Sequence, residues 1–319
     1  MSATGWYVHH HGRGHLTRFL AVRRHLSGPV TVFSSLEAPS VLPPETAWVR
    51  LPRDDGPLPD GSDPSGAEPQ AGGALHWAPL QHDGHRARMA VIAATCEIER
   101  FDRFVVDVSV EVAMLVRLLG VPTVVMAQPG ERDDEPHRLA YRAATRIVVP
   151  WAEGLQTTPV VEANRERARW VGAISRFDER MPALGERTGP VLVLGGAEGP
   201  APTPGAVHLD GAEWVDDPWA LLAGSEIVVT AAGQNALADL AAAGARAVVV
   251  PQQRPFDEQR ASAEVLAREG MAVVVDAWPS AEEWPAHLER ARALQPDWSR
   301  WAVHGGALRA ARAIEQVGP

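Results

Sequence analysis

Short apolar segments alternate with longer segments of helical periodicity along most of the chain. The apolar segments are rich in Val and Ile, which is typical of parallel strands that are covered by helices on both faces. The following ranges are predicted to be strands: 5–9, 30–34, 46–51, 104–108, 121–127, 147–150, 191–194, 208–214, 227–230, 247–250 and 271–275. The alternation therefore predicts an α/β protein built from βαβ units.

Helical patterns fill the intervals between these strands. We expect helices over the following ranges: 16–26, 86–100, 216–224, 235–243, 257–268, 280–294 and 296–314, with another that ends at Leu119. The 319 residues are too many for one doubly wound sheet and suit two domains of about 150 residues each. The change of domain is expected between residues 151 and 187.

Composition narrows the possible partners. The net charge of −10 argues against a general nucleic-acid partner, because phosphate backbones select basic surfaces. Cys96 is the single cysteine, so an intrachain disulfide is impossible. No run approaches the roughly 20 apolar residues that span a bilayer, and no apolar signal segment follows Met1. We therefore expect a cytoplasmic protein, and peripheral membrane contact stays open.

Two polar loops in the second half follow successive predicted strands. Gly233 lies between a strand and a helix, where the backbone can approach closely and free helix amides suit a diphosphate. Neutral amides and carboxylates in segment 251–259 suit the hydroxyls of a sugar ring. The predicted donor-binding residues here are Gly233, Gln234, Asn235, Asp239, Gln253, Asp257 and Gln259. The alternative is an ordinary βαβα unit with exposed polar loops.

The first half opens with a strand, a Gly-rich loop and a helix. The loop reads H-H-G-R-G-H from His10 to His15, and it lacks the third Gly of a dinucleotide fingerprint, so NAD is not expected. Histidine titrates near neutral pH and can act as a general base. His15 is the first candidate for this role and His11 is its rival, while a structural hydrogen bond of His15 is the alternative. Adjacent histidines on an extended segment point in opposite directions, so no metal site is predicted.

Two more candidates end the following predicted strands. Asp107 ends a buried strand, and a buried carboxylate needs a partner. Its alternative role is to cap the next helix, although Ser109 is the better cap. Gln128 ends the next strand and is a candidate acceptor ligand.

The long segment before the second predicted helix is polar. Residues 52–73 are rich in Pro, Gly and Asp, so we expect a mobile surface loop. Segment 76–85 contains three histidines, of which His82 is a candidate acceptor ligand. A metal site built from His76, His82 and His85, or a plain loop leading into the helix, are the alternatives.

Segment 225–275 resembles the donor-binding half of GT-B glycosyltransferases, and of the MurG-like family in particular. That family has a Gly loop, an acidic residue six positions later, a strand followed by Pro, and an Asp-x-Gln segment. The corresponding residues here are Gly233, Asp239, Pro251, and Asp257 with Gln259. The resemblance implies that Asp239 holds the ribose, and that Asp257 and Gln259 hold the sugar. The chain departs from the family at Ala231, where relatives place His or Arg, and at Asp239, where Glu is more common.

The loop with Gly12, Gly14 and His15 resembles the G-x-G-H loop that opens many GT-B glycosyltransferases. The resemblance implies that His15 is the catalytic base, and that Asp107 orients it or binds the acceptor hydroxyl. Gly14 is then expected beside the donor.

The resemblance also implies that Gly196 approaches the diphosphate. In this sequence Ala197 and Glu198 stand beside it in place of the family's hydroxyl side chains.

The same resemblance implies the GT-B architecture, in which two Rossmann-like doubly wound domains face each other across a cleft. The expected division is an acceptor-binding domain at 1–165, a linker at 166–187, a donor-binding domain at 188–300, and a last helix at 301–319 that crosses back toward the first domain.

These features predict a glycosyltransferase that moves a sugar from a nucleotide-diphosphate sugar, with UDP favoured, to a hydroxyl acceptor. Transfer is expected to invert the anomeric carbon and to need no metal or cofactor. The predicted partners are the nucleotide sugar and an acceptor that the sequence does not identify. An epimerase or hydrolase acting on nucleotide sugars, and a non-catalytic nucleotide-sugar binding protein, are the alternatives.

Overall fold

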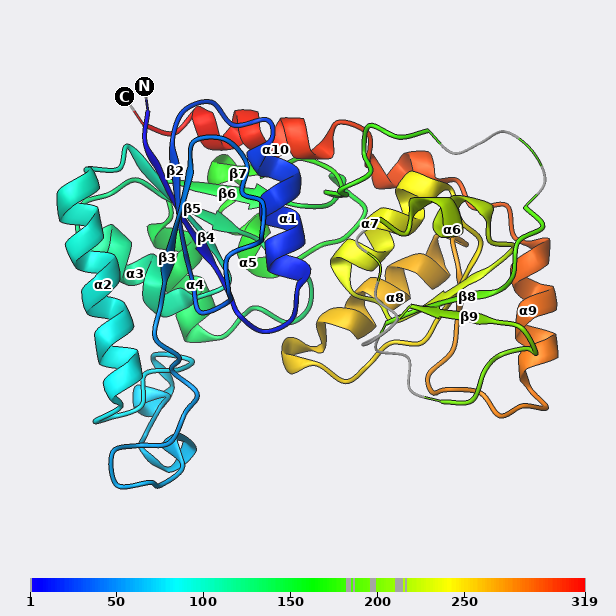
Figure 1. The fold of residues 1–319 in the computed structure, drawn as a ribbon, viewed down its shortest axis with the longest axis horizontal. Helices are drawn as coiled ribbons and strands as arrows, with labels where there is room; N and C mark the ends of the chain where they lie inside the picture. Colours follow the sequence, from blue (N-terminus) through cyan, green and yellow to red (C-terminus); the bar gives the residue numbers. More distant parts are fainter. Residues whose placement is uncertain are drawn as a thin grey trace.

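The computed structural model describes residues 2–181, 185, 187–195, 199–209, 215 and 217–318. These residues form two α/β domains side by side (Figure 1), each built on its own parallel sheet. The predicted architecture of two doubly wound domains is therefore confirmed.

The sheet of the first domain has seven strands in the order β3-β2-β1-β4-β5-β6-β7, all parallel in the described residues. Its strands are β1 (Thr4–Val8), β2 (Val30–Ser34), β3 (Thr46–Arg50), β4 (Arg103–Asp107), β5 (Thr123–Met126), β6 (Arg146–Val149) and β7 (Ala168–Trp170). Along β1, Trp6 and Val8 face one core while Tyr7 faces the other. Helices cover both faces, which is why these strands are apolar throughout.

The sheet of the second domain has five parallel strands in the order β12-β11-β10-β8-β9. Its strands are β8 (Leu192–Leu194), β9 (Val207–Leu209), β10 (Val228–Thr230), β11 (Ala247–Val249) and β12 (Val273–Val274). The strand order reverses between β1 and β4 in the first sheet, and between β8 and β10 in the second. Ligands of open α/β sheets bind beyond the carboxyl ends of strands at such reversals.

The described residues contain the following α-helices: α1 (Gly14–Arg23), α2 (Asp83–Glu99), α3 (Val110–Leu118), α4 (Glu135–Ala143), α5 (Pro159–Glu162), α6 (Trp219–Gly224), α7 (Gln234–Ala243), α8 (Glu258–Arg268), α9 (Trp284–Ala293) and α10 (Gly306–Glu315). None of them combines the length and apolarity needed to cross a bilayer. Helix α4 was not predicted. The helix predicted at 296–314 is interrupted, because Ala302 and Gly305 adopt left-handed φ angles of 49° and 74°.

The last helix lies on the first domain although it follows the second in sequence (Figure 1, red). Ala307, Ala310 and Ile314 of α10 belong to the same buried cluster as Trp6 and Phe19. The chain therefore crosses between the domains a second time near its end.

Candidate active site

His15 and Asp107 meet at the carboxyl edge of the first sheet. His15 is the second residue of α1, which follows β1, and Asp107 is the last residue of the neighbouring β4. His15 Nδ1 lies 3.1 Å from Asp107 Oδ1. The Asp107 side chain is fully buried, whereas that of His15 is 19% exposed. With Nδ1 bound to the carboxylate, Nε2 has no hydrogen-bond partner among the described residues and is the nitrogen left to accept a proton.

Asp107 is held as an anion by its neighbours. Arg18 Nη1 donates to Asp107 Oδ1 at 3.2 Å, and Gln128 Nε2 donates to the same oxygen at 3.4 Å. Burial raises the pKa of Asp107, but Arg18 and His15 together outweigh it and hold that pKa below its ordinary value. Asp107 Oδ2 is buried and has no hydrogen-bond partner within the described part of the chain.

The residue after Asp107 is strained. Val108 has a φ of 65°, which a β-branched residue rarely adopts. Such a conformation costs on the order of 1–3 kcal/mol and is found most often at functional sites. Ser109 Oγ then accepts from Val112 N and caps α3. Asp107 is therefore free of the capping role that the sequence left open.

The amino end of α7 faces that of α1 across the boundary between the domains (Figure 1). Asn235 Nδ2 donates to Gly14 O at 2.5 Å, and Arg18 Nη2 donates to Gln234 Oε1 at 2.9 Å. A Cβ atom on Gly14 would lie 2.8 Å from Asn235 Nδ2, so any other residue at this position would displace the Asn235 side chain. Gly233 is the N-cap of α7. Two helix amino ends converge here, and both favour an anion.

Asp239 and Gln259 have protein partners that the sequence did not reveal. Ser175 Oγ donates to Asp239 Oδ1 at 2.6 Å, and Arg176 Nε donates to Oδ2 at 3.2 Å. Burial raises the pKa of Asp239 in spite of Arg176. Both oxygens of Asp239 are thus engaged by the segment that joins the domains, and the predicted role of Asp239 toward the ribose stays a prediction.

Gln259 ties together the loops that follow β10 and β11. Its Oε1 accepts from Ala232 N at 3.2 Å and from Gln252 N at 2.9 Å. Gln253 and Asp257 are exposed on the second of these loops. Their predicted roles toward the sugar stay predictions, and Gly196 lies outside the described residues.

The three predicted acceptor residues lie in different surroundings. Gln128 is buried beside Asp107, as described above. The side chain of His11 is 70% exposed, and its Nε2 lies 4.0 Å from Asp55. His82 is buried and caps α2, with Nδ1 accepting from His85 N and Nε2 directed at Gly56 O. Both ring nitrogens of His82 therefore have contacts within the fold, and its predicted role toward the acceptor stays a prediction.

A small cavity with an apolar wall lies next to this site, at the contact between the domains. Its polar lining comes from His76, Ser109, Gln128, Arg132 and His137, and Phe256 closes it from the second domain. Arg132 lies over the Phe256 ring at 4.4 Å, and its Nη2 donates to Glu258 Oε2 at 3.1 Å. This contact could not be predicted from the sequence, because its residues are distant in the chain.

His76, Asp134 and His137 place ring nitrogens and carboxylate oxygens close together. His137 Nε2 lies 3.4 Å from Arg132 Nη1, which can only donate, so the proton of His137 is on Nδ1. Nδ1 therefore donates to Asp134 Oδ2 at 2.6 Å. A protonated nitrogen does not ligate a metal, so the contacts favour a hydrogen-bonded cluster.

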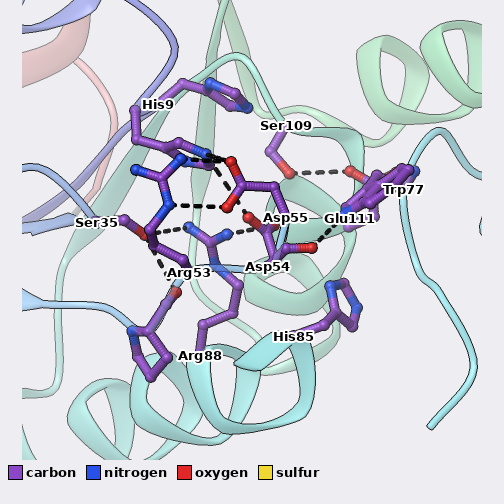
Figure 2. A network of polar contacts seen from close by, with 12 residues as sticks. His9, Ser35, Arg53, Asp54, Asp55, Trp77, His85, Arg88, Ser109 and Glu111 are labelled. Carbon is purple, nitrogen blue, oxygen red and sulfur yellow. Dashed lines mark hydrogen bonds and ion pairs between the residues drawn. The ribbon is translucent and has the colours of Figure 1, made fainter. Parts of the chain in front are cut away.

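Segment 52–82 is anchored by a buried arginine (Figure 2). Arg88 of α2 donates through Nη2 to Tyr7 Oη at 3.1 Å and to Ser35 Oγ at 3.2 Å, and it pairs with Asp54. Trp77 Nε1 donates to Asp54 O at 2.7 Å. The range 52–73, which was predicted to be a mobile surface loop, thus contains Asp54, whose side chain and backbone are both tied into the first domain.

The comparisons with known proteins agree with this geometry. Residues 206–289 match the family model described as the glycosyltransferase family 28 C-terminal domain. No curated protein sequence matches the chain.

Three solved structures illustrate the likeness of the whole chain. The glycotransferase of kitacinnamycin has a TM-score of 0.67 at 17% identity, with 100% of this chain and 99% of that chain covered. MurG of Acinetobacter baumannii has a TM-score of 0.60 at 14% identity, with coverages of 99% and 100%. UGT2 of Phytolacca americana has a TM-score of 0.61 at 13% identity, with coverages of 99% and 94%.

At these identities the structures establish the fold, and the family model adds the class of the second domain. By its GT-B fold and by the domain at residues 206–289, the chain is a glycosyltransferase.

Proposed function

We propose that the protein transfers a sugar from a nucleotide-diphosphate sugar to an acceptor hydroxyl, with inversion of the anomeric carbon. The observation that carries the proposal is the position of the His15–Asp107 pair opposite the amino end of α7. The pair supplies a base, and the helix end supplies a site for the diphosphate. UGT2 of Phytolacca americana forms a complex with UDP-2fluoro-glucose, and the spinosyn rhamnosyltransferase SpnG forms one with thymidine diphosphate, so uridine and thymidine donors are tested first.

The chemical step follows from the free nitrogen of His15. The acceptor oxygen attacks the anomeric carbon as its proton passes to His15 Nε2, and the bond from that carbon to the diphosphate oxygen breaks. Asp107 accepts the Nδ1–H of the resulting imidazolium and stabilises its charge. Attack from the face opposite the leaving group inverts the anomeric carbon.

The leaving diphosphate is stabilised by the two helix ends. The backbone amides of Gln234 and Asn235 are among the unpaired donors of the first turn of α7, and α1 presents its own first turn nearby. Fixed donors aimed at a developing charge lower the barrier without needing to reorganise. We therefore propose that the reaction proceeds without a metal.

The acceptor is placed by the first domain. The cavity beside Asp107 has an apolar wall and a few polar groups, which suits an acceptor with an apolar body and a hydroxyl. Phe256 closes this cavity from the donor domain, so we propose that the acceptor enters when the domains separate.

The test begins with a thermal-shift panel of nucleotides and nucleotide sugars, because a ligand of the folded state raises the melting temperature. With the best donor, His15→Ala is expected to lower kcat by about 10²- to 10⁴-fold while donor affinity changes little. NMR of the product reports the anomeric configuration, and EDTA reports metal dependence.

Three outcomes would contradict the proposal. Equal losses of turnover and donor affinity in His15→Ala would exclude the role of base. An isomerised donor formed without acceptor would identify an epimerase, and donor binding without turnover of any acceptor would indicate a binding protein.

A further inference from the structure

Arg18 lies one turn after His15 in α1, and its side chain is only 4% exposed. Its two terminal nitrogens reach different domains, with Nη1 bound to Asp107 Oδ1 at 3.2 Å and Nη2 bound to Gln234 Oε1 at 2.9 Å. A buried guanidinium is costly unless its charge and its donors are matched. One acceptor of Arg18 is the catalytic carboxylate, and the other is the first residue of the proposed donor-binding helix.

Arg18 is the permanent cation at Asp107. The described groups that face this carboxylate are His15 and Arg18 from α1 and Gln128 from the loop after β5, and Tyr141 of α4 interacts electrostatically. His15 has to be neutral to accept a proton, and the side chains of Gln128 and Tyr141 are uncharged at neutral pH. The charge of the buried carboxylate is therefore balanced by the guanidinium, which stays protonated at every working pH.

We propose that Arg18 is a positioning residue that keeps Asp107 anionic while His15 is neutral, and that links this carboxylate to the donor-binding helix through Gln234. The inference rests on the transfer chemistry proposed above. The two arms serve these roles separately. Nη1 balances the charge of Asp107, and Nη2 holds Gln234 of α7 against α1.

Loss of Arg18 has a defined chemical consequence. Without it Asp107 is left in a buried site without a counter-charge, and its pKa rises because the largest lowering influence is gone. A protonated Asp107 no longer accepts the Nδ1–H of His15 as an anion, so the imidazolium that forms during transfer loses its stabilisation.

The first experiment compares kcat, donor KM and the pH–rate profile of Arg18→Met, Arg18→Lys and Gln234→Ala. Arg18→Met is expected to lower kcat by about a hundredfold, to raise donor KM no more than Gln234→Ala does, and to move the acidic limb of the profile to higher pH. Arg18→Lys keeps the charge and should leave that limb in place. Gln234→Ala should leave the limb in place and raise donor KM. An unmoved acidic limb in Arg18→Met would overturn the proposal.

The second experiment needs no substrate, so it separates failure of this inference from failure of the proposed function. Melting temperatures are compared for the starting protein, Arg18→Met, Asp107→Asn and the double variant. If Arg18 compensates Asp107, Asp107→Asn lowers the melting temperature of the starting protein but raises that of Arg18→Met. Additive effects would overturn the proposal.

The comparison of these variants can still be interpreted if Arg18→Met fails to fold. Recovery of folded protein in the double variant then supports compensation. If the double variant also fails to fold, the test falls to Arg18→Lys, which retains the charge. A shifted acidic limb in this variant would overturn the proposal.

Discussion

Each domain presents one edge to the other domain, and the two edges carry different chemical groups. On the first domain, charged side chains are buried and bonded to one another, with Asp107 fully enclosed by α1 and its neighbours. On the second domain, the edge offers helix amides and neutral side-chain amides, while Gln253 and Asp257 point to solvent. The first edge is therefore organised by contacts within the protein, and we expect the second to be completed by its ligand. Changes on the first should affect turnover or stability, and changes on the second should affect donor affinity.

The largest effect is expected at the first edge, from Asp107→Asn. Asparagine keeps the shape but cannot stabilise an imidazolium at His15, and it leaves Arg18 without its counter-charge. We expect kcat to fall by about 10⁴-fold, the order typical of neutralising the carboxylate partner of a catalytic histidine. Single-turnover rates measure the chemical step, and a nucleotide titration measures donor affinity. A loss confined to donor affinity would show that the two edges do not divide the work in this way.

The next effect tests how firmly the first domain is organised. Arg88 is 1% exposed and pairs with Asp54, so Arg88→Met leaves a carboxylate and two hydroxyls without their donor. We expect a loss of about 3 kcal/mol in the free energy of unfolding, measured in urea.

The matched control for Arg88 is Arg53, which pairs with Asp55 nearby on the surface and is 58% exposed. Arg53→Met should cost less than about 1 kcal/mol, as exposed pairs usually do. Similar losses in both variants would mean that Arg88 is not the anchor of segment 52–82.

Most of the fold could be predicted from the sequence, because buried parallel strands are apolar on both faces and stand out between polar loops. Helix α4 was missed because its buried side includes the polar residues His137 and Tyr141. These residues do not form an apolar stripe that the sequence pattern would show. The break in the last helix depends on Ala302, whose left-handed backbone has no sequence signal of its own.

The candidate site was predictable only in part. His15 and Asp107 were found from their places beside Gly-rich and strand-end motifs. Arg18 was missed because an arginine in a helix normally faces solvent, and the partner that explains its burial is 89 positions away. Val108 was missed for a related reason, since strain at one residue is imposed by the surrounding structure and not by its type.

A smaller effect is expected at His137, which lines the cavity at the contact between the domains. Burial lowers the pKa of His137 from 6.5 to about 4, although Asp134 opposes this shift. Between these values the unfolded chain binds a proton that the folded protein does not, so stability falls as pH decreases from 6.5. We expect about 2 kcal/mol of this loss by pH 5, from 1.36 kcal/mol per pH unit.

His137→Gln should reduce the slope of stability against pH, measured by urea unfolding across this range. His208 is half-buried in β9 of the second domain, away from this contact, so His208→Gln is the control. An unchanged slope in His137→Gln would contradict the burial of a neutral imidazole at this contact.

The smallest effect belongs to the second edge, at Asn235. Its side-chain amide donates to Gly14 O at 2.5 Å and fixes the amino end of α7 against α1, where the diphosphate is proposed to bind. Asn235→Ala should raise donor KM by about tenfold, or about 1.4 kcal/mol, and change kcat little, because the His15–Asp107 pair keeps its own contacts. Asn164 makes the same kind of bond, from Nδ2 to Val160 O at 2.8 Å, outside the candidate site. Asn164→Ala should therefore lower stability without raising donor KM. A fall in kcat as large as the rise in KM for Asn235→Ala would instead mean that the two edges act as one unit, since loosening the donor helix would then also misalign the base.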